Sequence, residues 1–334
     1  MASSRCLGTV TAGSFLVPGQ QSQTMPMYGN WDRQDSLERR IGFSWVSRRQ
    51  KWSLPGDSRA AVWVVPNIEH YEYLPAVIGP RDPWPRMPHP DVQGYGGKDY
   101  GNRVGLWRLF DVLDKYSIRC TVSLSMSVLE MYPVIFEAME IRGWEYMSHG
   151  LYNTRYVWGC TENEERRLVR HCVDIHRRMT GRPLPGWFSP AVSCTLNTPD
   201  LVAEARIRFY CDLYHDDQPT LVKTKHGTLV SVPYSMDLND AMVYRQPVEG
   251  AEFERMIIDH FDTVYAEGET NPRVMCIALH PYMMGAPHRI RYLDRALAYI
   301  SSHDKVWFAT GSEIAAWYLQ NNPDDRLSGI REGR

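Results

Sequence analysis

Long apolar runs are missing from this sequence of 334 residues. A transmembrane helix needs roughly 20 consecutive apolar residues, and no stretch approaches that length. The first residues, MASSRCLGTVTAGSFLVPG, carry one arginine and a mild apolar stretch interrupted by Gly, Thr and Ser, which is not the pattern of a secretory signal. We therefore expect a cytoplasmic protein without a membrane partner.

Runs of like charge are missing as well. The 37 Lys and Arg residues nearly balance the 39 Asp and Glu residues, which leaves a formal net charge of -2. A nucleic-acid groove or a membrane-surface helix would need a concentrated basic stretch. We expect no nucleic-acid partner.

Cysteine pairs of the CxxC type are absent too. The seven cysteines are an odd number and are scattered, so they do not show the ligand spacing of a zinc finger or the motif of a redox site. We expect reduced thiols that are mostly buried.

The first part of the chain lacks a regular spacing of hydrophobic residues, whereas the rest of the chain shows one. Residues 1–58 are rich in Ser, Gln, Gly and Arg, and we interpret them as an extension that wraps the body or mediates assembly into a homo-oligomer. Residues 59–322 form the body, and residues 323–334 form a tail. Within the body, residues 73–101 are rich in Pro, Gly and aromatics, which is typical of a lid or binding loop.

Apolar β-rich runs and helical patterns alternate through the body. AAVWVVPNIE (60–69) is a buried strand that turns polar at its end, and residues 162–181 form an amphipathic helix with acidic residues first, basic residues last and a glycine stop. Repeated strand–helix units predict parallel strands with helices outside. About seven such units favour an α/β fold, a distorted (β/α)7-type TIM-like barrel, over a doubly wound open sheet.

Catalytic side chains of such barrels gather at the carboxyl ends of the strands. The polar residues that follow the predicted strands are therefore the site candidates. They are Asn67, Glu69, His70, His149, Asn153, Ser189, Pro190, Asp212, Asp216, Asp217, Asp240 and His280.

Seven segments hold or adjoin these candidates. They are PNIEHYE (66–72), YGNRVGLWRL (100–109), SHGLYNT (148–154), RPLPGWFSP (182–190), DDQP (216–219), PYSMDLND (233–240) and LHPYMMGAPHRI (279–290). Together they resemble the polysaccharide deacetylase superfamily, the NodB-homology domains, and most closely its allantoinase-like, metal-independent branch. The resemblance implies a distorted barrel that hydrolyses amide-like carbon–nitrogen bonds and that assembles from several subunits.

The resemblance also implies residue roles. In metal-dependent members, an acid and two histidines four residues apart hold a divalent ion, a second acid activates water, and a late histidine protonates the leaving nitrogen. Glu69 matches the metal-binding acid, His149 the first histidine and His280 the late histidine. Asn67 falls where the water-activating acid would be, and Asn153 falls where the second histidine would be.

The two asparagines change the chemistry that the resemblance implies. An amide has no basic lone pair near pH 7, so Asn67 cannot be the general base, and the amide oxygen of Asn153 is a poor zinc ligand compared with imidazole. We therefore predict no cofactor, with Glu69 as the base and His149 or His280 as the acid or oxyanion partner. The alternative is a divalent metal such as zinc, held by Glu69, His149 and Asn153.

Substrate binding is assigned to the two asparagines and to five further residues, each of which also has an ordinary structural interpretation. Arg103 would clamp a carboxylate or cap a helix, and Trp187 would stack on a ring or fill the core. His70, Asp217 and Asp240 would contact the substrate or satisfy local hydrogen bonds and turns.

We predict a hydrolase that acts on a non-peptide carbon–nitrogen bond of a small amide, cyclic ureide or imide, with a small molecule as its partner. One alternative is a metal-dependent N-deacetylase of an acylated sugar. The other is a catalytically inactive barrel that binds a ligand. Catalysis needs Glu69, His149 and His280 to meet at one end of the barrel, and separate directions would favour the inactive barrel.

Overall fold

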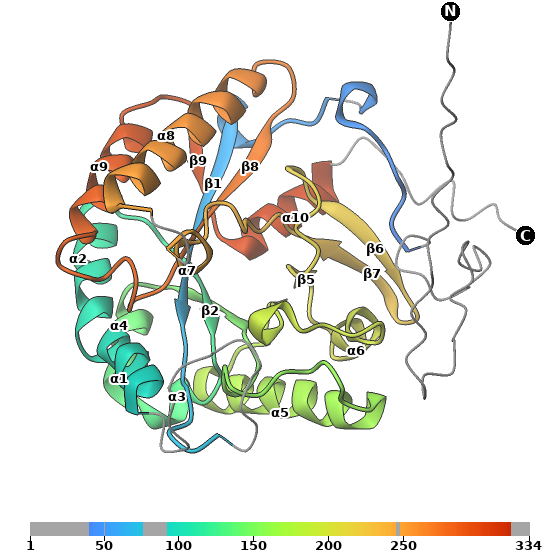
Figure 1. Ribbon diagram of the computed structural model, residues 1–334. Coiled ribbons are helices and arrows are strands. Elements are labelled where there is room, and N and C mark those ends of the chain that lie inside the picture. Colours follow the sequence, from blue (N-terminus) through green and yellow to red (C-terminus); the bar gives the residue numbers. More distant parts are fainter. Residues whose placement is uncertain (1–39, 50, 76–91, 245–247, 322–334) are drawn as a thin grey trace, which may run out of the picture. The chain divides into compact units, whose positions relative to one another are not determined.

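Figure 1 shows the computed structural model of the chain, which describes residues 40–49, 51–75, 92–244 and 248–321. Seven strands of the described residues run parallel in one curved wall. They are β1 (Ala60–Ile68), β2 (Thr121–Leu124), β3 (Glu145–Ser148), β4 (Gly186–Trp187), β5 (Phe209–Tyr210), β7 (Gly227–Ser231) and β8 (Arg273–Leu279). The predicted fold, a distorted (β/α)7-type barrel, is confirmed.

The strand order in the wall is β6-β7-β5-β4-β3-β2-β1-β8. β6 (Thr220–Thr224) is antiparallel to β7, and β9 (Val306–Phe308) pairs with the first residues of β1. Beyond β8, a parallel bridge joins Asn239 to Ala278, so the segment after β7 lies against the last strand. The antiparallel β6 lies outside the expected series of strand–helix units.

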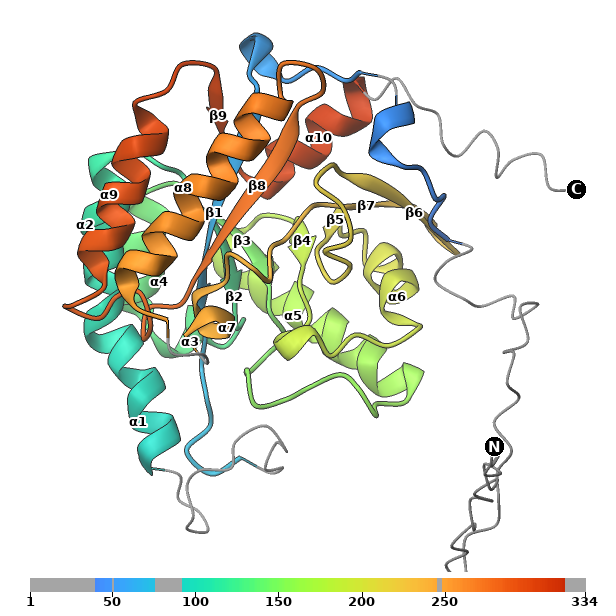
Figure 2. The same ribbon diagram turned by 45° about the horizontal axis from the view of Figure 1, so that its top comes forward.

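Helices cover the outside of the strands (Figure 1 and Figure 2). They include α2 (Leu106–Lys115), α4 (Pro133–Ile141), α5 (Glu162–Thr180), α6 (Thr198–Glu204), α8 (Gly250–Glu267) and α9 (Ile290–Ser301). By contrast, α10 (Gly311–Asn321) packs against the residues that point into the barrel, through Ile314, Ala315 and Tyr318. α5 begins with a capping box, in which Thr161 and Glu164 satisfy each other's backbone N–H groups, and it ends at Gly181 with a φ of 71°. These signals are local, which is why the sequence predicts this helix well.

One helix lies where a loop was expected. α1 (Val92–Tyr100) falls in the predicted loop 73–101 and continues through a π-helical turn, Gly101–Gly105, into α2. Gly105 lies so close to the loop after β8 that a Cβ atom would come within 2.0 Å of the carbonyl oxygen of Pro281. Close packing therefore requires glycine at position 105. Residues 76–91 of the expected loop lie outside the described residues.

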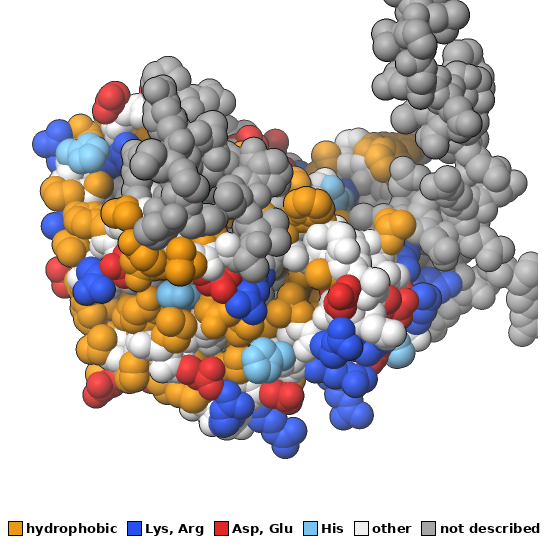
Figure 3. Space-filling model, turned by 60° about the horizontal axis from the view of Figure 1, so that its bottom comes forward, with side chains coloured by type: hydrophobic (Ala, Val, Ile, Leu, Met, Phe, Trp, Pro, Cys, Tyr) orange, Lys and Arg blue, Asp and Glu red, His pale blue; other side chains and the backbone are white. Residues whose placement is uncertain are grey.

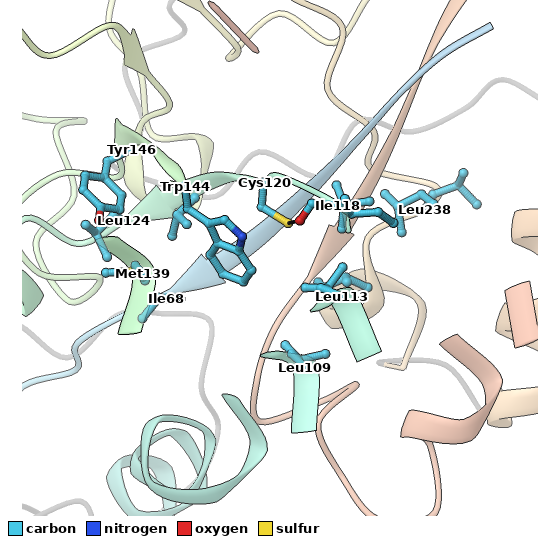
Figure 4. Packing of buried hydrophobic residues seen from close by; sticks show 14 of the residues in the cluster. Ile68, Leu109, Leu113, Ile118, Cys120, Leu124, Met139, Trp144, Tyr146 and Leu238 are labelled. Atoms are coloured by element: carbon cyan, nitrogen blue, oxygen red, sulfur yellow. Dashed lines mark hydrogen bonds between the residues drawn. The ribbon is translucent and has the colours of Figure 1, made fainter. Parts of the chain in front are cut away.

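The core has an inner and an outer layer because successive side chains of a strand point to opposite faces. In β1, Ala61, Trp63 and Val65 point into the barrel, whereas Val62 and Val64 point toward the helices. Figure 4 shows the outer layer, in which Leu109 and Leu113 of α2 pack near Ile118 and Cys120. The rigid wall fixes the direction of each residue that follows a strand.

The described part of the predicted extension already packs on the body. Trp52 and Leu54 are 4% and 2% exposed and belong to the inner cluster, and Nε1 of Trp52 donates to the carbonyl oxygen of Pro272 over 2.8 Å. A wrapping role for this part fits the contacts, and a role in assembly remains a prediction. The cysteines of the described residues are all unpaired, as expected. No described helix combines the length and the apolar character that crossing a membrane requires.

Candidate active site

Three titratable side chains meet where three parallel strands end. Glu69, His149 and His280 are each the first residue after a strand, namely β1, β3 and β8. Oε1 of Glu69 lies 3.4 Å from Nε2 of His149 and 3.7 Å from Nε2 of His280. The three residues are 3–6% exposed. The structure thus brings together the three residues that the sequence assigns to catalysis.

The face of the molecule at this end of β1 is mixed in character. Figure 3 shows hydrophobic side chains among acidic, basic and histidine side chains on this face. No single sign of charge dominates it, so the surface alone does not select a strongly charged polymer.

The Glu69 carboxylate is held from several sides. The Tyr71 hydroxyl donates to Oε2 over 2.9 Å, the Tyr282 hydroxyl donates to the same oxygen over 3.4 Å, and Asn102 Nδ2 donates to the backbone oxygen of Glu69 over 2.8 Å. Burial alone would raise the pKa of Glu69, but the positive charge of His280 outweighs burial and lowers that pKa well below its ordinary value. Glu69 is therefore ionised at neutral pH and is a weak base.

His280 is held as an imidazolium between two carboxylates. Its Nδ1 lies 2.7 Å from Oδ1 of Asp240, and Oδ2 of Asp240 accepts the backbone N–H groups of His280 and Met284 over 2.8 and 3.2 Å. Burial lowers the pKa of His280, but Asp240 and Glu69 outweigh burial and raise it to about 9. His280 is consequently a proton donor at neutral pH, with Nε2–H facing Glu69.

His149 differs from His280 in the group that it presents to the site. Its Nδ1 lies 3.0 Å from the carbonyl oxygen of Phe188, which can only accept, so Nδ1 carries the proton. The Phe188 ring stacks on the imidazole with centroids 4.9 Å apart. In the neutral form of His149, Nε2 therefore presents a bare lone pair to the site and can act as a base.

Asn67 and Asn153 form hydrogen bonds at the two positions where the metal-dependent pattern has an acid and a second histidine. Asn153 Nδ2 donates to the Tyr71 hydroxyl, and Asn153 Oδ1 is buried and finds no hydrogen-bond partner within the described part of the chain. Asn67 Nδ2 donates to the Tyr234 hydroxyl over 3.1 Å and to the Leu279 carbonyl oxygen over 3.3 Å. Asn67 thus joins β1 to β8 beside Glu69.

Comparisons with known proteins identify the family of this chain. A Schizosaccharomyces pombe protein whose name assigns it to the polysaccharide deacetylases is 30% identical over 260 residues, which are 72% of this chain and 81% of that protein. A polysaccharide deacetylase family model matches residues 98–209. The chain belongs to the polysaccharide deacetylase family. As a member of that family, it is a hydrolase of carbon–nitrogen bonds other than peptide bonds.

Further proteins of known name or structure resemble this chain. A Helicobacter pylori peptidoglycan deacetylase is 22% identical over 271 residues, which are 69% of this chain and 92% of that protein. The crystal structure of Puue allantoinase matches with a TM-score of 0.74 and 27% identity over 83% of this chain and 96% of that chain. A deacetylase-type structure from Pseudomonas aeruginosa PAO1 matches with a TM-score of 0.71 and 29% identity over 81% of this chain and 95% of that chain.

The family includes metal-dependent deacetylases, but the donor set here does not fit a zinc ion. Glu69 and His149 remain as good ligands, whereas zinc sites use three or four nitrogen, sulfur or carboxylate ligands. Asn153 replaces the second histidine, and its amide is oriented by the bond to Tyr71. Among the residues that the structure describes, no three His, Cys, Asp or Glu side chains are arranged to hold a metal.

Four of the predicted substrate-binding residues do not join this cluster. Arg103 is exposed and pairs with Asp99. Asp217 is exposed, and its carbonyl oxygen accepts from Val274 at the start of β8, whereas His280 follows the opposite end of that strand.

The other two are buried beside the site but face away from it. Trp187 is fully buried in the outer core layer, and its Nε1 donates to the Ser189 hydroxyl over 3.0 Å. His70 follows Glu69 in the chain, but its Nδ1 contacts the Tyr132 hydroxyl at 2.9 Å. The side chain after a strand and its neighbour point to opposite faces, which separates His70 from Glu69.

Sequence reasoning missed the residues that hold Glu69. Tyr71 and Tyr282 each follow a catalytic candidate by two residues, which is the spacing that returns a side chain to the same face of an extended chain. Asn102 stands between two close-packed glycines in GNRVG. The spacing of the two tyrosines can be seen in PNIEHYE and LHPY. The role of Asn102, by contrast, depends on the π-helical turn and has no sequence signature.

Proposed function

We propose that the protein hydrolyses a carbon–nitrogen bond of a small amide, cyclic ureide or imide without a tightly bound metal. The observation that carries this proposal is the hydrogen-bond chain from Asn153 through Tyr71 to Glu69. This hydrogen-bond chain begins at Asn153, which stands at the position of the second histidine. It ends at Oε2 of Glu69, the acid that would bind a metal, where that oxygen accepts the Tyr71 hydroxyl. The site is thus supported by hydrogen bonds in place of a ligand shell.

Burial of the site supports a small substrate. Glu69, His149, Asn153 and His280 are all no more than 7% exposed, whereas a polymer would need an open groove. The similarity to an allantoinase structure, which the chain matches over most of its length, supports the same class of substrate. The curated relatives carry deacetylase names, so a metal-dependent N-deacetylase of an acylated sugar is the second candidate.

The charges of the site suggest how hydrolysis proceeds. His149 Nε2 takes a proton from water as the water oxygen attacks the carbonyl carbon, and His280 Nε2–H stabilises the oxygen that becomes negative. As the carbon–nitrogen bond breaks, His280 gives its proton to the leaving nitrogen. The sequence assigned the base to Glu69, but its lowered pKa makes Glu69 a poor base. We assign the base to His149 because its Nδ1 is held by the Phe188 carbonyl, which leaves Nε2 free to accept a proton.

Glu69 has a different part in this scheme. Its Oε1 lies near Nε2 of both imidazoles, at 3.4 and 3.7 Å, so it can return the proton from His149 to His280 after each turnover. It also favours the imidazolium form of His280 before turnover. Because the three side chains converge, the geometry argues against an inactive binding barrel.

The proposal is tested with the full chain after treatment with a chelator, with its metal content measured. Turnover is assayed with allantoin, hydantoin, simple imides and N-acetylated sugar oligomers, with and without added zinc. We expect metal-free turnover of a cyclic ureide, an imide or another small amide, unchanged by chelator. Activity confined to acylated sugars in the presence of zinc would establish the second candidate instead. A homo-oligomer and a cytoplasmic location remain predictions.

A further inference from the structure

A buried carboxylate that the reaction does not use lies behind His149. Asp212 follows β5 and is 4% exposed. Its Oδ1 accepts the backbone N–H of Ser189 over 2.7 Å, and its Oδ2 accepts the hydroxyl of Ser189 over 2.6 Å. The carboxylate is thus bound to both donors of one residue in the loop after β4.

Asp212 and His149 lie on opposite faces of the barrel wall. Ser189 shares the outer face with Trp187, whose Nε1 donates to the Ser189 hydroxyl, and the outer core layer contains Trp187 and Tyr210. Phe188 belongs to the inner layer, and its ring stacks on His149. Among the described residues, no hydrogen bond joins the Asp212 carboxylate to His149 itself.

One peptide unit connects the two residues through the wall. The N–H of Ser189, which donates to Asp212, and the C=O of Phe188, which accepts from His149 Nδ1 over 3.0 Å, belong to the same planar amide. A carboxylate on the N–H side of an amide increases the negative charge on its oxygen, because linked hydrogen bonds polarise one another. The carbonyl of Phe188 is thereby a stronger acceptor for His149.

The strength of this acceptor decides which nitrogen of neutral His149 is bare. Oε1 of Glu69 lies 3.4 Å from Nε2 and attracts a proton to that nitrogen, while the Phe188 carbonyl attracts the proton to Nδ1. If Glu69 won this competition, Nε2 would carry hydrogen and could not act as a base. A negative charge on the Nδ1 side of the ring would oppose the effect of Glu69 and favour the tautomer with a bare Nε2.

We propose that Asp212 is a positioning residue that holds neutral His149 in the tautomer with a bare Nε2, acting through the peptide between Phe188 and Ser189. Burial raises the pKa of Asp212 to about 6, and the bonds from Ser189 oppose that rise, so Asp212 is ionised above that pH. The catalytic consequence rests on the proposed function, because it requires His149 to be the base.

The test compares Asp212→Asn with Glu165→Gln in the full chain at pH 8. Both changes remove a buried carboxylate and keep its shape, but Glu165 is bound by Thr195 and Thr198, not by the peptide that contacts His149. Side-chain ¹⁵N shifts of His149 report which nitrogen is protonated. In Asp212→Asn the ratio of the two neutral tautomers should move several-fold toward protonated Nε2, because the Phe188 carbonyl loses the polarisation that the Asp212 carboxylate imposes through the shared peptide. Glu165→Gln should leave the ratio as in the wild type.

The wild-type protein provides a test that does not depend on variants folding. Its neutral His149 should show a protonated Nδ1, and a protonated Nε2 there would overturn the proposal, as would an unchanged ratio in Asp212→Asn or an equal change in Glu165→Gln. With an active substrate, Asp212→Asn should lower kcat with little change in KM. A tautomer change without hydrolase activity on any substrate would refute the proposed function and leave the role of Asp212 standing.

Discussion

Asp240→Asn should convert His280 from a protonated acid to a neutral imidazole near pH 8. The pKa of His280 is raised to about 9 from an ordinary 6.5, and at 1.36 kcal/mol for each unit of pKa this favours the imidazolium by about 3 kcal/mol. Among the groups that raise it, the Asp240 charge acts most strongly, and burial opposes it. Without that charge, burial should bring the pKa of His280 to about 7 or below.

NMR titration of His280 measures this directly, and the pH dependence of kcat/KM reports it in turnover. Since His280 acts as an acid, activity should persist below its pKa and fall above it. The falling limb should lie near pH 9 in the wild type and about two pH units lower in Asp240→Asn, which makes the variant roughly tenfold slower at pH 8. A variant whose His280 still titrates near 9 would show that Asp240 does not hold the proton.

The pH dependence of the free energy of unfolding provides an independent test of the raised pKa of His280. Because the pKa of His280 is raised by folding, its contribution to stability is complete below about pH 6.5 and is lost as the pH rises through about 9. The difference in unfolding free energy between the wild type and Asp240→Asn should therefore shrink across that range. Asp237→Asn is the matched control, since Asp237 lies three residues away and is exposed; it should change neither the titration nor the pH profile.

Three further changes test separate parts of the site and its support. Glu69→Gln should keep the fold and slow turnover by about 10²–10⁴-fold, because the variant loses one of the two carboxylates that keep His280 protonated and cannot return the proton; near-normal kcat would exclude a role for the carboxylate. Asn153→His should raise the zinc content of purified protein, measured by elemental analysis, and unchanged content would mean that the geometry cannot bind metal. Gly105→Ala should lower the free energy of unfolding by about 1–3 kcal/mol, because its Cβ would meet the Pro281 carbonyl. Gly97→Ala, on α1 with open space around it, should be neutral or stabilising in the same denaturant assay.

The strands of the barrel could be predicted because their signals are local. AAVWVVPNIE is buried along its whole length and becomes polar where β1 ends, so both the strand and the first catalytic candidate, Glu69, follow from the sequence. His149 and His280 were found in the same way, with the help of the family resemblance. Their meeting at one place follows from parallel strands, whose carboxyl ends lie at the same end of a barrel.

The helix α1 and the contact of Asn102 with Glu69 could not be predicted in this way. Residues 92–101 contain four glycines, which is an unfavourable composition for a helix, and their helical form depends on packing against the loop after β8. Asp217 was assigned by its place after a predicted strand, but the chain there has already turned toward the start of β8. Position after a strand predicts a site residue only where the strand's end is correctly located.

The charges of the site explain why two departures from the metal-dependent pattern are compatible with catalysis. A metal ion would polarise the carbonyl oxygen of a substrate, whereas in the proposed mechanism the imidazolium of His280 has that role. Asp240 and Glu69 on either side keep it protonated near neutral pH. A preorganised donor at a developing oxyanion contributes about 10²–10³-fold in rate, so an imidazolium can replace part of what an ion would supply. In the proposed mechanism, Asn153 in place of the second histidine removes a metal ligand but leaves His280 as the electrophile. The Tyr71 hydroxyl, which donates to Glu69 and accepts from Asn153, holds that carboxylate near both imidazoles for the proposed proton return.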